Sequence, residues 1–126
     1  MTAPRITVST LPATYAEAER LLAGKDERRV NANGRLSRDT SYCIALVLHH
    51  TVVVRFWSDG VTEFSTGGWR SATTAKWMKP AANVLGWRVG REQGTITFRR
   101  FDGHGDALVP AFALNRAGEP VVQVAR

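Results

Sequence analysis

An uninterrupted apolar stretch at the centre of the chain constrains the fold more than any other feature. From Tyr42 to Leu48 every side chain is apolar or small. Such a pattern is typical of a strand that lies centrally in a sheet or is covered on both faces. A second apolar stretch, Val52 to Trp57, follows the pair His49-His50. Two interpretations remain open: a hairpin that turns near His50, or one long strand from Tyr42 to Trp57.

Turn residues predict further strands on either side of this stretch. Ser58-Asp59-Gly60 favours a tight turn because Asp and Gly accept positive φ values, so we expect a third strand over Val61 to Phe64. A second hairpin is predicted from Trp87 to Arg91 and from Thr95 to Phe101, joined by a turn that contains Gly94.

Two helices are expected. Thr14 is a suitable N-cap for a short amphipathic helix that ends at Gly24. A second helix should include Ala75 to Lys79, and Pro80 either ends it or kinks it into the segment that Gly86 closes.

These elements predict a single α+β domain over residues 1–126, with 1–13 as a loosely attached arm or a short edge strand. We expect one antiparallel sheet of about five or six strands, built from two hairpins, with two short helices packed on it. A further strand is placed near Arg28 to Ala32, followed by a turn, and Val121 to Val124 can add an edge strand. Leu108 to Leu114 is expected to cover one end of the core. An exposed edge strand can pair two copies of the chain, so a homo-oligomer is allowed.

The positive charge is concentrated in one third of the chain. The net charge is +6, and the segment from Thr66 to Phe101 alone carries +6, with Glu92 as its only acidic residue. A basic surface favours contact with phosphate backbones or other acidic surfaces. The basic residues of this segment are Arg70, Lys76, Lys79, Arg88, Arg91, Arg99 and Arg100.

Basic residues interleaved with aromatic residues are typical of proteins that bind single-stranded nucleic acid, because cations follow the phosphates while rings stack on bases. The sequence therefore predicts a nucleic-acid-binding protein in which the seven basic residues contact phosphates and Trp69 or Trp77 stacks on bases. The alternative is a solvated arginine-rich face over buried tryptophans. In a second functional hypothesis, the protein is an interaction module whose arginine-rich second hairpin docks on an acidic surface of a host protein and modulates that protein.

Other chemistry finds less support in the sequence. Gly67-Gly68 before a capped helix can form an anion cradle, or simply a tight turn. His49, His50 and His104 lack the spacing of a metal or hydrolytic site, and Cys43 has no second thiol. We therefore predict no enzyme activity, no metal and no cofactor. No stretch has the length and apolarity of a membrane span, so no membrane partner is expected.

The segment from Asn33 to Phe98 resembles a family of small, uncharacterised proteins of tailed bacteriophages. In that family a strand with the pattern LHxT leads to a hairpin that ends in Asp-Gly, and a Gly-Gly-Trp turn precedes a Thr-Thr pair that opens a helix. The resemblance implies a phage gene product that is made in the host cytoplasm. The matching residues are Asn33, His49, Thr51-Val52-Val53, Asp59-Gly60, Ser65, Gly67-Gly68-Trp69-Arg70 and Thr73-Thr74.

Overall fold

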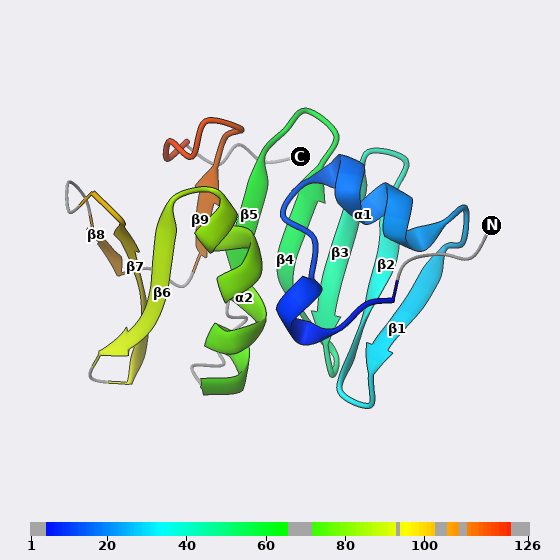
Figure 1. Cartoon of the computed structure of the whole chain (residues 1–126), viewed down its shortest axis with the longest axis horizontal. Coiled ribbons are helices and arrows are strands. Elements are labelled where there is room, and N and C mark those ends of the chain that lie inside the picture. The colour runs from blue at the N-terminus through cyan, green and yellow to red at the C-terminus, as the bar shows by residue number, and fades with distance from the viewer. Residues whose placement is uncertain (1–4, 66–71, 93, 103–105, 109–110, 122–126) are drawn as a thin grey trace.

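The computed structural model describes residues 5–65, 72–92, 94–102, 106–108 and 111–121. Over these residues the chain forms two α-helices, a short 3-10 helix and nine strands (Figure 1). In chain order they are η1 (Val8–Thr10), α1 (Tyr15–Leu22), β1 (Glu27–Asn31), β2 (Gly34–Thr40), β3 (Cys43–Leu48), β4 (Thr51–Trp57), β5 (Thr62–Ser65), α2 (Ala72–Val84), β6 (Trp87–Glu92), β7 (Thr95–Arg100), β8 (Asp106–Leu108) and β9 (Ala111–Leu114).

The strands form two antiparallel sheets, which confirms the α+β class and corrects the expectation of a single sheet. Six strands follow the order β1-β2-β3-β4-β5-β9, and the other three follow the order β6-β7-β8. The two predicted hairpins therefore lie in different sheets. The physical reason is that β9 returns to pair with β5, with Phe64 opposite Phe112, and so occupies the edge that β6 would need to join the larger sheet.

The central hairpin is confirmed. β3 and β4 pair from Cys43 opposite Trp57 to Leu48 opposite Thr51, which leaves His49 and His50 as a two-residue turn. One long strand is therefore excluded. All six residues of β3 are buried, as expected for a central strand. The Asp-Gly turn and the strand after it are also confirmed, since Val61 N–H donates to the Asp59 carboxylate at 3.0 Å and β5 follows.

The strand near Arg28 and the turn after it are confirmed by β1 and the turn at Ala32-Asn33, but the segment after that turn forms β2, which was not predicted. Its sequence is mainly polar, but Leu36 is fully buried at its centre; Arg35 lies on the opposite face, and Arg38 lies on the same face as Leu36. Ion pairs from neighbouring elements hold these charged residues: Arg35 pairs with Glu27 of β1, and Arg38 pairs with Glu19 of α1 at 2.7 Å. The strand is thus stabilised by partners distant in sequence.

Both helices lie where they were expected. The Thr14 hydroxyl accepts the Glu17 N–H at 3.2 Å and caps α1, whereas Ala23, one residue before Gly24, already takes the left-handed conformation at the other end. α2 continues past Pro80 to Val84. A proline has no N–H to give to the carbonyl four residues earlier, so the helix forgoes that one hydrogen bond there. Neither described helix is long and apolar enough to cross a membrane.

One continuous core joins the two sheets and the helices. It contains Leu46 and Phe56 from the larger sheet and Met78 from α2. The rings of Phe64 on β5 and Phe98 on β7 lie 5.2 Å apart and connect the sheets directly. This packing places α2 between the larger sheet and β6 (Figure 1).

Candidate nucleic-acid interface

The hairpin of β6 and β7 separates an apolar face from a cationic one. Its register places Val89 opposite Phe98 and Arg88 opposite Arg99. Because side chains alternate across a strand, these two pairs lie on opposite faces. Val89 and Phe98 are buried in the core, whereas Arg88 and Arg99 are exposed. The predicted second hairpin is confirmed, and its pairing brings Arg88 beside Arg99.

An exposed aromatic ring completes the outward side. The guanidinium carbon of Arg88 lies 5.3 Å from the centre of the Phe101 ring, and Phe101 is 50% exposed. Arg99 forms an ion pair with Glu92 on the neighbouring strand. We call Arg88, Arg99 and Phe101 the arginine face. Two arginines directly across a ladder repel each other, and here Glu92 and the Phe101 ring offset that repulsion.

Phe101 was not singled out from the sequence, although a signal for it was present. It follows Arg99 by two residues, so strand alternation places both side chains on the same face. The sequence prediction assigns base stacking to Trp69 or Trp77, because the indole has the largest ring for stacking. The structure instead exposes a phenylalanine at the end of the second hairpin.

The helix α2 contributes cations but no stacking ring. Lys76 and Lys79 are exposed and lie three residues apart, so they share one side of the helix. Trp77 is only 2% exposed, which corrects its predicted role in base stacking. A Cβ atom built on Gly34 of β2 would lie 2.6 Å from the Trp77 ring, so the indole is packed directly on the larger sheet.

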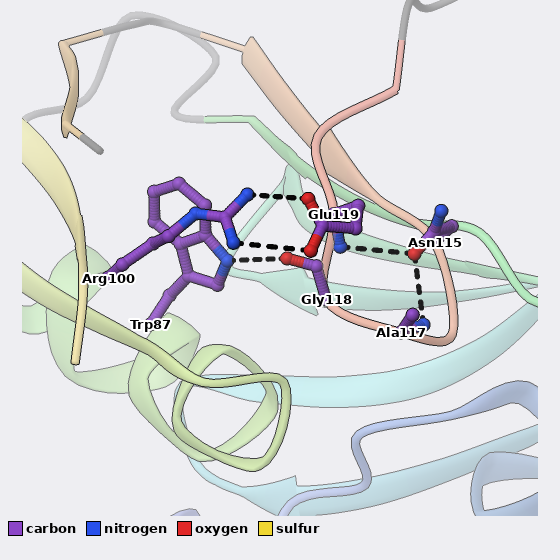
Figure 2. Close-up of polar contacts among 6 residues, drawn as sticks. All are labelled: Trp87, Arg100, Asn115, Ala117, Gly118 and Glu119. Atoms are coloured by element: carbon purple, nitrogen blue, oxygen red, sulfur yellow. Dashed lines mark hydrogen bonds and ion pairs between the residues drawn. The ribbon is translucent and has the colours of Figure 1, made fainter. Parts of the chain in front are cut away.

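Arg100 also departs from its predicted role, because it points to the opposite side of β7 from Arg99. Figure 2 shows its guanidinium over the Trp87 indole and against the Glu119 carboxylate. The two hydrogen bonds to Glu119 measure 2.7 and 3.2 Å. They hold the pKa of Glu119 below its ordinary value and raise that of Arg100. Arg100 therefore serves a structural contact rather than a phosphate surface.

The segment that contacts Arg100 is a tight loop after β9. The Asn115 side-chain oxygen accepts N–H groups from Ala117 and Glu119, at 2.9 and 3.0 Å (Figure 2). This folds the loop so that the Gly118 carbonyl accepts the Trp87 indole N–H at 2.8 Å. The larger sheet is thereby joined to β6 and β7 through Trp87 and Arg100.

The remaining predicted cations are only partly placed. Arg91 is exposed and pairs with Ile96, so it lies at the end of the hairpin in the register of the inward face. Trp69 and Arg70 lie outside the described residues, as do the Gly67-Gly68 turn and His104. Within the described ranges, no carboxylate pairs with Lys76, Lys79, Arg88 or Arg91. These four cations and Arg99 are the predicted contacts that remain exposed.

The arrangement offers positive charge and one exposed aromatic ring. In the part of the chain that the structure describes, no three His, Cys, Asp or Glu side chains gather where they could hold a metal. Comparisons of the chain with models of protein families, with curated proteins and with solved structures find no match.

Proposed function

We propose that this protein binds nucleic acid, with single strands favoured, and that the arginine face is the contact surface. The observation that carries the proposal is the cross-strand pair of Arg88 and Arg99 beside the exposed Phe101 ring. An exposed sheet face with a ring and flanking cations lets bases stack while phosphates meet guanidinium groups. Lys76, Lys79 and Arg91 would add phosphate contacts at the edges.

Single strands are favoured because a sheet face with one exposed ring stacks on an unpaired base. A duplex keeps its bases stacked on each other and presents mainly phosphates. The Phe101 ring is itself 50% exposed. The surface therefore leaves room for a base to approach Phe101. In this proposal the protein has no catalytic role, and it acts in the host cytoplasm as a phage product.

The proposal is tested by measuring the affinity for a fluorescent single-stranded oligonucleotide at several salt concentrations. Three or four phosphate contacts predict a log-log slope of roughly −2 to −3, since each contact contributes about −0.7 on single strands. Arg88→Ala should weaken binding and reduce the slope by about 0.7. Phe101→Ala should weaken binding by about 1–3 kcal/mol and leave the slope unchanged, because stacking releases no counterion.

Arg20→Ala is the matched control for these variants. Arg20 is an exposed arginine at the end of α1, so its removal changes the net charge by the same amount at a distant place. Equal losses in Arg20→Ala and Arg88→Ala would refute a localised site. No binding at low salt would refute the function.

The second hypothesis, docking on an acidic host protein, predicts a different result in the same system. Affinity capture from nuclease-treated host lysate should lose all partners if nucleic acid is the ligand. A protein that stays bound to the native chain but not to Arg88→Ala would favour the protein-interaction role instead.

A further inference from the structure

A cavity at the turn edge of the larger sheet has no part in the proposed nucleic-acid surface. Its volume is about 520 Å³, within the range of about 300–1,000 Å³ that is typical of small-molecule sites. The turn between β3 and β4 and the first turn of α2 both contribute to its lining. Figure 1 shows the β1–β2 turn, the β3–β4 turn and the start of α2 at the same end of the molecule.

The cavity has an apolar floor and a polar rim. Leu48 and Val53 are buried at 5% and 1% exposure and form the floor, together with the buried Thr74. His49, His50, Asn33 and Thr73 are exposed and form the rim. None of the described lining residues is acidic. A ligand with an apolar body and an anionic group would match this division.

The rim is held in a strained geometry. His49 adopts a φ of +58°, a left-handed conformation that is uncommon for a residue with a side chain. Its N–H donates to the Asn33 carbonyl at 2.6 Å, and its own carbonyl accepts from Arg35 at 3.3 Å. Backbone strain of this kind persists where surrounding contacts enforce it, and it is concentrated at functional sites.

The lining also gathers residues that are far apart in the sequence. The eight described lining residues are Asn33, Leu48, His49, His50, Thr51, Val53, Thr73 and Thr74. They come from the β1–β2 turn, the β3–β4 hairpin and α2. The fold brings these separate segments together around the cavity.

We propose that the cavity binds a nucleoside 5′-monophosphate. The base enters over Leu48 and Val53, where apolar surface is removed from water, and a histidine ring at the rim provides a stacking partner. The Asn33 amide can pair with a base edge, because amides match the donor and acceptor pairs that bases present. The phosphate lies at the rim, where imidazole and the Thr73 hydroxyl donate hydrogen bonds and no described lining carboxylate repels it.

Titration of the full chain with AMP, adenosine and inorganic phosphate tests this inference, with amide chemical shifts and calorimetry as readouts. AMP should bind at least tenfold more tightly than adenosine or phosphate alone, and shifts should be concentrated at Asn33, His49 to Thr51 and Thr73. AMP binding no tighter than that of phosphate would overturn the nucleoside part of the inference. No AMP binding at millimolar concentration would overturn the inference as a whole.

A matched pair of variants on one helix locates the site. Thr73→Trp places a bulky ring at the rim and should abolish AMP binding, whereas Asn83→Trp, on an exposed position near the other end of α2, should leave it unchanged. Circular dichroism checks that both variants fold, and His50→Ala, in an exposed turn, provides a milder change with an expected loss of fivefold or more. AMP binding that survives in Thr73→Trp would refute the cavity as the site.

The Arg88→Ala variant separates this inference from the proposed function. AMP binding should be unchanged in that variant, because Arg88 does not line the cavity. A loss of AMP binding there would place the mononucleotide on the arginine face and overturn the inference.

Discussion

Replacing Gly34 by alanine tests how α2 is held against the larger sheet. A Cβ atom at this position would lie 2.5 Å from the Val47 carbonyl oxygen and 2.6 Å from the Trp77 ring. Neither neighbour can move easily, because Val47 belongs to a buried central strand and Trp77 is 2% exposed. Gly34 is not among the described residues with a positive φ, so an alanine here would destabilise the fold through packing and not through backbone strain.

The expected loss follows from this geometry. Overpacking a well-filled core costs about 1–3 kcal/mol, and a contact with both backbone and a buried ring places Gly34→Ala in the upper half, at about 2–3 kcal/mol. At roughly 4 °C per kcal/mol for a domain of this size, the melting temperature should fall by about 8–12 °C. Such a loss is a sizeable fraction of the 5–15 kcal/mol that typically separates the folded and unfolded states.

Urea unfolding followed by tryptophan fluorescence measures the loss, since Trp77 and Trp87 are both buried. Gly90→Ala is the matched control: it is also a strand glycine without positive φ, but its nearest neighbour to a new Cβ is the Thr97 hydroxyl at 3.4 Å. We expect Gly90→Ala to change the free energy of unfolding by less than about 1 kcal/mol, because alanine only relieves the entropy cost of glycine. Equal stabilities of the two variants would refute the close packing of Trp77 on β2.

Two further predictions concern ion pairs. Arg38 lowers the pKa of Glu19 mainly through their hydrogen bonds, so this carboxylate stabilises the fold above its ordinary pKa of 4.5 and loses that contribution as the pH falls through its lower folded value. Glu19→Gln should therefore be less stable than the native chain at pH 7, by up to about 1 kcal/mol for a partly exposed ion pair. Thermal melts below pH 4 should show this difference in stability shrink. A difference that stays constant with pH would refute the role of the Glu19 carboxylate. Arg100→Gln should lower the melting temperature and leave the salt dependence of oligonucleotide binding unchanged. The control Arg88→Gln should reduce that salt dependence and leave the melting temperature unchanged.

The hairpins could be predicted because their signals are local. Apolar alternation and the Asp-Gly turn act within a few residues of each other. The strands they indicated, at 42–48, 52–57 and 61–64, lie within one residue of β3, β4 and β5, although one long strand over the first two had stayed open. β2 was missed because its stabilising partners are distant: Glu19 lies on α1, and Leu36 is buried by the core rather than by its neighbours in sequence. The division into two sheets was missed for the same reason, since it depends on β9 pairing with β5.

The position of Trp77 could have been read from the sequence. Thr74, Met78 and Ala81 recur at helical spacing and are buried, and Trp77 lies on that side of the helix, three residues after Thr74. The cavity, by contrast, was beyond sequence reasoning. Its rim joins Asn33 to His49 through one backbone hydrogen bond between two turns, and no local pattern encodes that contact.

The basic segment illustrates why net charge overstates a binding surface. Seven basic residues give this segment its excess of positive charge. Strand alternation, however, directs Arg100 to Glu119 on the inward side, and Arg99 forms an ion pair with Glu92. An arginine of β7 can contact a phosphate only if its side chain lies on the outward side of the strand. The register of β7 with β6 determines which arginines do so. The same register brings Arg88 to Phe101, so the pairing of two strands, more than the abundance of arginine, creates the surface that we propose for nucleic acid.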